Sequence, residues 1–120
     1  MNNLNITVPE FIVMGGDFNT PLERIDKKGG NPTLKQSAIN EIKSMKERFG
    51  LIDILRAKHP FSEMFSWEML RPTIIQERLD YLLVTKNLEN SITNACILPK
   101  SFSDHGNAYG QHYPDVAVSL

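Results

Sequence analysis

The chain has 120 residues, of which 41% are hydrophobic and 22% are charged, which is ordinary for a globular domain. No apolar stretch approaches the roughly 20 residues of a membrane-spanning helix, so we expect no membrane partner. The formal net charge of −1 gives no support of its own to nucleic-acid binding. The first residues lack the features of a secretory signal, and the single cysteine, Cys96, excludes an internal disulfide, so we expect an intracellular protein.

The first half of the chain predicts a strand, a loop and a helix. The apolar run of residues 11–14 is typical of a buried strand. A helix is expected over residues 34–49, with Asn31 or Thr33 as its N-cap and Gly50 ending it. Its apolar residues recur at helical spacing. They are Leu34, Ala38, Ile39, Ile42, Met45 and Phe49.

The second half of the chain reads as a series of short strands. A short apolar element (51–55) precedes strands at 64–69, 79–85, 95–98 and 115–120, with 71–77 as a turn or hairpin arm. Cys96 lies in one of these apolar runs and is expected in the core. One helix followed by several strands predicts an α/β (α+β) chain that forms half of a sandwich.

A polar motif follows the first strand directly. Gly15 and Gly16 lead into Asp17, Phe18 and Asn19. In extended backbone, residues two apart point to the same side, so an acid that accepts a proton from water would lie beside an amide that holds a phosphate oxygen. An alternative remains open: the same residues could form only a turn closed by a side-chain hydrogen bond.

Two further motifs carry an acid beside a cation or an imidazole. Asp80 stands in an apolar strand, where a charge is costly without a partner; histidine would be a natural partner, and Arg78 is the structural alternative. Asp104 and His105 follow Ser103 in a polar loop. A carboxylate is a hard oxygen ligand of the kind Mg²⁺ prefers, and a histidine can stabilise a phosphoryl oxygen. The set suits metal-assisted attack of water on a phosphodiester.

These motifs, in this order, resemble the last three motifs of the endonuclease/exonuclease/phosphatase (DNase I-like) superfamily. They are residues 16–19, 78–81 and 103–105, and residues 19–22, 51–54 and 65–67 resemble the branch of LINE-type (non-LTR) retrotransposon endonucleases. The resemblance covers nearly the whole chain but only the C-terminal half of the family's domain. It implies part of a four-layer α/β/β/α sandwich, mostly antiparallel, with one main helix.

The resemblance also implies a role for each motif residue. Asp17 would act as the base, Asn19 and His105 would hold the phosphate, Asp80 would orient His105, and Asp104 would bind Mg²⁺, with Mn²⁺ as an alternative.

Two weaker assignments follow from the same resemblance. Lys27 stands where the branch often has an arginine, and with Ser103 it is assigned to substrate binding. A lysine keeps the charge of an arginine but loses its bidentate fork.

The resemblance implies DNA as substrate, a nuclear location, and as partners a missing N-terminal half or a reverse transcriptase domain. The missing half normally supplies a metal-binding glutamate and the opposing sheet. We therefore expect residues 1–120 to be a partial domain that is weakly active or inactive alone. A glycine-rich insert at 106–112 separates the last motif from the final strand. Two alternatives stay open: a phosphatase of the same superfamily acting on a small phosphate ester, and a degenerate fragment without activity.

Overall fold

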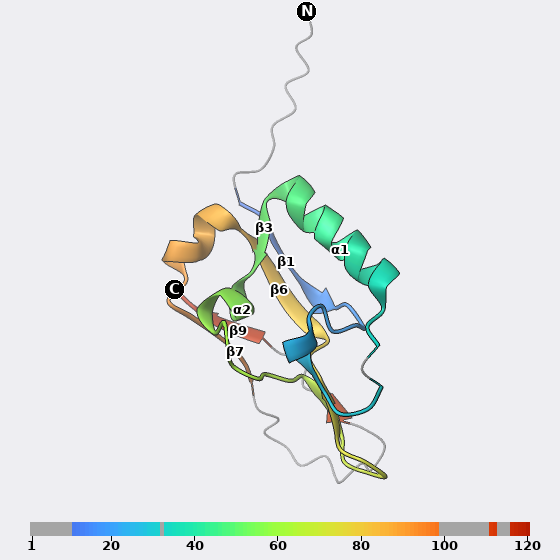
Figure 1. Cartoon of the computed structure of the whole chain (residues 1–120). Helices are drawn as coiled ribbons and strands as arrows, with labels where there is room; N and C mark the ends of the chain where they lie inside the picture. The colour runs from blue at the N-terminus through green and yellow to red at the C-terminus, as the bar shows by residue number, and fades with distance from the viewer. Residues whose placement is uncertain (1–10, 32, 99–110, 113–115) are drawn as a thin grey trace, which may run out of the picture.

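The centre of the chain is a three-stranded antiparallel sheet. The computed structural model describes residues 11–31, 33–98, 111–112 and 116–120. The sheet has the order β1 (Val13–Asp17), β6 (Asp80–Thr85) and β3 (Leu51–Asp53). Figure 1 shows β6 between its two neighbours, with helix α1 (Gln36–Phe49) lying alongside. The predicted strands at the start of the chain and at 79–85 are thus neighbours in space. The expectation that the first strand is buried is wrong, because β1 lies at the edge of its sheet and Phe11 and Val13 are 55% and 61% exposed.

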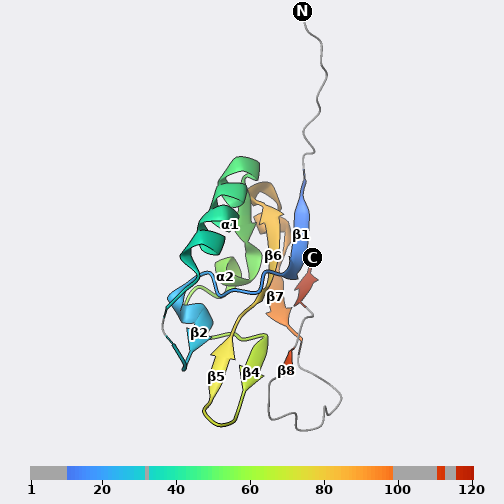
Figure 2. The same cartoon turned by 90° about the vertical axis from the view of Figure 1, so that its right-hand side faces the viewer.

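A second antiparallel sheet continues from one end of the first. Its order is β2 (Lys27–Lys28), β5 (Ile75–Glu77), β4 (Trp67–Met69) and β8 (Gln111–His112). In Figure 2 the hairpin of β4 and β5 extends below β6. The predicted hairpin arm is therefore confirmed. The end of the expected insert at 106–112 pairs with β4 as β8, and residues 106–110 lie outside the described residues.

The remaining described elements are short. Strand β7 (Asn94–Ile97) pairs with β9 (Val116–Ser119) in a two-stranded antiparallel sheet. Helix α2 (Ile54–Lys58) and two 3₁₀ helices, η1 (Arg24–Asp26) and η2 (Lys86–Ser91), complete the fold.

Helix α1 begins and ends for different reasons. Gly50 adopts a left-handed φ of 63° and its N–H bonds back to the last turn, which confirms the predicted C-cap. The predicted N-caps are wrong, because Lys35 occupies that position without a side-chain cap. The Asn31 side chain instead accepts the N–H of Thr33 at 2.9 Å, forming a turn before the helix.

The core divides between the two faces of β6, because successive strand residues point to opposite faces. Tyr81 and Leu83 pack with Ile39 of α1 in one cluster. Val84 packs with Leu55 of α2 and Ala95 of β7 in the other. The predicted apolar face of α1 is confirmed at Ile39, Ile42 and Met45, whereas Phe49 is 41% exposed. Leu34 packs on the same cluster but precedes the helix.

Two expectations on single segments need correction. Cys96 is exposed, because Ala95 and Ile97 are the β7 residues that face the core. The apolar run 51–55 is two elements: β3 ends at Asp53, whose side chain accepts the N–H of Arg56 and so caps α2.

The class prediction is confirmed. The described chain is a mixed α/β structure with antiparallel strand pairing and one long helix. Within these residues, no helix has the length and apolar character needed to cross a membrane.

Candidate active site

The end of β1 forms a tight polar turn. Asp17 is the last residue of β1, and its carboxylate accepts the N–H of Asn19 at 2.7 Å. Asn19 has a positive φ of 59°, which asparagine tolerates better than most residues. The expected extended geometry of Asp17 and Asn19 is therefore wrong, because the chain has already turned at Asn19. Both side chains remain exposed at the rim of the sheet.

Asp80 lies directly across from Asp17. The two residues are paired between β6 and β1, so their side chains leave the same face of the sheet. Asp80 is 2% exposed whereas Asp17 is exposed. One buried and one accessible carboxylate thus share the end of two neighbouring strands. Phe18 leaves the site on the other side and stacks on the Tyr81 ring, with centroids 5.3 Å apart.

The backbone that carries Asp80 is held by Ser66. The Ser66 hydroxyl oxygen accepts the N–H of Leu79 at 2.8 Å and the N–H of Asp80 at 3.1 Å. Ser66 is fully buried, and its own N–H donates to the carbonyl of Glu77. A single hydroxyl thus satisfies two buried donors where the chain passes from β5 into β6.

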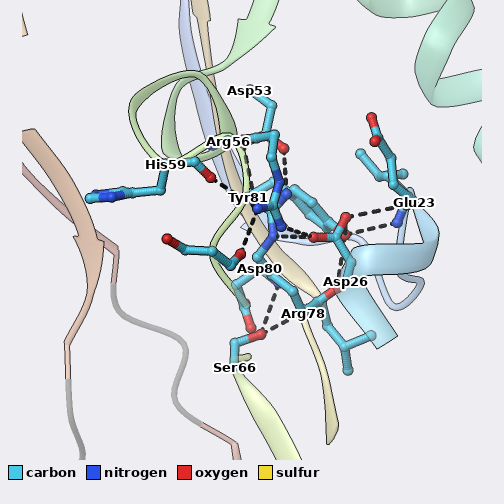
Figure 3. Close-up of polar contacts among 12 residues, drawn as sticks. Glu23, Asp26, Asp53, Arg56, His59, Ser66, Arg78, Asp80 and Tyr81 are labelled. Atoms are coloured by element: carbon cyan, nitrogen blue, oxygen red, sulfur yellow. Dashed lines mark hydrogen bonds and ion pairs between the residues drawn. The ribbon is translucent and has the colours of Figure 1, made fainter. Parts of the chain in front are cut away.

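Behind this backbone lies a group of four charged residues, here called the buried charge cluster: Asp26, Asp53, Arg56 and Arg78. Arg78 Nε donates to Asp26 at 2.9 Å, and its two terminal nitrogens donate to the two Asp53 oxygens at 3.1 and 2.6 Å. Arg56 donates to the same Asp26 oxygen at 2.6 Å. Figure 3 shows these contacts converging from separate segments. The Arg78 guanidinium therefore binds Asp26 and Asp53.

Tyr81 closes the cluster. Its hydroxyl donates to the Arg78 carbonyl at 2.8 Å and accepts the N–H of Leu22 at 2.9 Å, while its ring lies 4.3 Å from the Arg78 guanidinium carbon. Burial, and then the charge of Asp26, raise the pKa of the Tyr81 hydroxyl well above its usual value. Burial alone would lower the pKa of Arg78, but hydrogen bonds and attraction to Asp53 and Asp26 outweigh it and raise that pKa.

Lys27 is engaged within the second sheet. Its ammonium lies 2.9 Å from the Glu77 carboxylate, and the two residues face each other across β2 and β5. Their side chains are 16% and 19% exposed. The Lys27 charge, which the sequence assigned to substrate binding, is thus balanced by Glu77, a partner that the sequence did not suggest.

The third motif, Ser103, Asp104 and His105, lies outside the described residues. The structure therefore brings together Asp17, Asn19 and Asp80 only. The carboxylates of Asp17 and Asp80 are hard oxygen donors, the kind of ligand that Mg²⁺ prefers. Across the described ranges, no group of three or more histidine, cysteine, aspartate or glutamate side chains gathers closely enough to hold a metal ion.

Several residues that shape the site were not predicted. Ser66 stood within the quoted segment 65–67, and its small polar side chain before an aromatic strand was the available signal. Asp53 stood within the quoted segment 51–54. The partners of Asp26, Asp53 and Arg56 could not be predicted, because each ion pair joins residues far apart in sequence. Tyr81 was quoted only as part of a motif.

Comparisons with known proteins agree with this fold. No protein-family model matches the chain. It is 27% identical over 97 residues to the transposon TX1 uncharacterized 149 kDa protein of Xenopus laevis, covering 80% of this chain and 7% of that protein. The crystal structure of the AP endonuclease LMAP from Leishmania major superposes with a TM-score of 0.66 at 17% identity. That match covers 85% of this chain and 35% of the solved one.

The chain thus spans about a third of the AP endonuclease and a small part of the transposon protein. A similarity of this kind, at low identity, establishes the fold. The chain therefore has the fold of part of a DNase I-like domain, as the resemblance predicted, and is similar in sequence to part of a transposon protein.

Proposed function

We propose that this chain is part of a Mg²⁺-dependent phosphodiesterase domain that hydrolyses the backbone of DNA. The observation that carries the proposal is the pairing of Asp17 with Asp80 at one end of β1 and β6, beside the Asn19 turn. An accessible acid next to an amide is the arrangement that water attack on a phosphate needs. The similarities to an AP endonuclease and a transposon protein support the same reaction class.

Each described residue has a task in this proposal. The exposed Asp17 carboxylate takes the proton of the attacking water. The Asn19 amide, displayed by its left-handed turn, donates to a phosphate oxygen. Asp80 is buried and fixed by the Ser66 hydroxyl through its backbone, which suits a carboxylate that orients an imidazole rather than one that reacts. That imidazole would be His105.

Asp104 would bind the metal ion. When bound, Mg²⁺ neutralises phosphate charge and lowers the pKa of a bound water; Mn²⁺ would serve as an alternative. A missing N-terminal half and a reverse transcriptase domain remain predicted partners, and a nuclear location remains a prediction. Because the chain spans about a third of the solved AP endonuclease, we propose weak activity for it alone.

A plasmid-nicking assay with added Mg²⁺ tests the proposal. The series compares the wild-type chain with Asp17→Asn, His105→Ala and a surface control, Glu41→Gln, on the exposed side of α1. We expect slow nicking that ends on chelation and is lost in the Asp17 and His105 variants but not in the control.

Three other results would count against the proposal. Nicking that survives chelation or both site variants would assign the activity to a contaminant and remove support for these roles. Absence of nicking by the wild-type chain would refute nuclease activity for this chain on its own. Hydrolysis of a small phosphate monoester, measured in the same series, would favour the phosphatase alternative.

A further inference from the structure

Lys35 joins the start of α1 to the Asn19 turn. It is exposed, and its ammonium donates to the Asn19 carbonyl oxygen at 3.2 Å. A lysine ammonium has three donors, so this contact uses only one of them. The positive charge therefore stands at the turn whose amide is proposed to hold the phosphate, with donors left for a second acceptor.

Lys27 is less suited to that task. Its charge is already balanced by Glu77, and both side chains are largely buried. Moving Lys27 to a phosphate would leave the Glu77 carboxylate in the sheet without its partner, which is unfavourable. Lys35 carries no such cost, because it contacts a neutral carbonyl group.

Two adjoining hollows, together called the groove, lie beside Lys35 and reach Arg24 of η1. One hollow of about 410 Å³ is lined by Arg24, Thr33, Leu34 and Gln36, and the last two are the neighbours of Lys35 in the chain. A second hollow of about 130 Å³ shares Arg24 and Leu34 and reaches Lys27 and Gly29.

Arg24 supplies the second cation of this groove. It is exposed and forms no ion pair with any residue that the structure describes. Glu23, next to it in the chain, is an exposed acid that partly offsets its charge. Arg24 thus places positive charge in the lining of this groove, and Lys35 places a second positive charge beside it, next to Leu34 and Gln36 in the chain.

We propose that Lys35 binds a backbone phosphate of a polynucleotide held at the Asn19 turn, and that Arg24 binds a further phosphate along the same groove. The proposal rests on the proposed function and names two residues that would position its polynucleotide substrate. Two separated cations fit an extended polyanion, whereas a small phosphate ester would occupy only one of them. Phosphate contacts of this kind position the strand and do not read its sequence.

Fluorescence anisotropy with a labelled DNA duplex tests the proposal. Binding is measured in EDTA, so that no strand is cut, over a series of salt concentrations. Each phosphate contact contributes about 0.9 to the slope of log affinity against log salt. The variants are Lys35→Gln, Lys35→Arg and Arg24→Gln. The matched control is Lys43→Gln, an exposed lysine further along α1. Thermal melting checks that every variant is folded.

We expect Lys35→Gln and Arg24→Gln each to lower the slope by about 0.9, and the double variant by about twice that. Between 50 and 200 mM salt, the affinity of each single variant should therefore fall by about 3.5-fold less than that of the wild type. Lys35→Arg should keep the wild-type slope, and Lys43→Gln should not change it.

Three results would overturn the proposal. They are a wild-type chain that does not bind the duplex, a Lys35→Gln slope equal to that of wild type, and an equal loss in Lys43→Gln. The nicking assay separates this proposal from the proposed function. Binding with the expected slopes but no nicking would refute cleavage alone. Nicking that depends on Asp17 but not on Lys35 or Arg24 would refute the groove alone.

Discussion

Replacing Arg78 by lysine tests how much the buried charge cluster contributes to stability. Arg78 is fully buried and makes three hydrogen bonds, one to Asp26 and two to Asp53. Lysine keeps the charge but presents it as a point, without the planar fork that matches a carboxylate. Arg78→Lys therefore loses about two of the three charge-assisted bonds and the stacking on Tyr81.

The expected cost follows from these contacts. A hydrogen bond to a charged group contributes about 1.5–3 kcal/mol, so two lost bonds cost about 3–6 kcal/mol. The retained charge recovers part of this, and we expect a net loss of about 3 kcal/mol. A small domain is stable by only about 5–15 kcal/mol, so the loss is a large fraction of the total.

Urea denaturation followed by circular dichroism measures this change. With a slope of about 1.5 kcal/mol per molar urea, the midpoint should fall by about 2 M. The control is Arg48→Lys, because Arg48 is an exposed arginine that lies over the Phe49 ring. It should change stability by less than about 0.5 kcal/mol. An Arg78→Lys midpoint that matches the control would refute the energetic role of the bidentate contact.

Two further predictions concern the neighbours of Arg78. Ser66→Ala removes the acceptor of the Leu79 and Asp80 N–H groups and should cost about 1–3 kcal/mol in thermal unfolding, whereas Ser62→Ala at the surface should be neutral. Equal melting of the two variants would contradict this. Because the pKa of Tyr81 is raised on folding, the folded state keeps a proton that the unfolded chain releases, so stability should fall as pH rises above about 10. In Tyr81→Phe, the urea midpoint should no longer fall in this way as the pH rises. A fall equal to that of the wild type would exclude Tyr81 as its source.

Local signals predicted much of the fold. Gly50 marked the end of α1, because only a left-handed residue lets the last turn close in this way. An apolar run marked β6 and alternating apolar residues marked β9, although neither signal showed which strands pair. The start of α1 was not predictable from Asn31, since its side chain serves the turn before the helix. Helix α2 was hidden in an apolar run, where Asp53 changes the chain from strand to helix.

The site was predictable only in part, for a physical reason. Asp17 stood out as an acid that follows an apolar run and Asp80 as an acid at the head of one, and the structure pairs them. The expectation that Lys27 is free for substrate did not anticipate its pairing with Glu77, 50 residues away. Partners of this kind depend on tertiary structure, which short patterns do not contain. The roles of Ser103, Asp104 and His105 stay predictions.

The buried charge cluster has a consequence for the order of folding. Its ion pairs join residues 25, 30 and 52 positions apart, so none of them can form by local winding of the chain. Burying a charge before it is paired is strongly disfavoured, so we expect these side chains to be desolvated late in folding. The cluster would then form after the rate-limiting barrier, and weakening it would mainly speed unfolding. The four charged residues therefore pair only after the loop, helix and sheet that carry them have packed together.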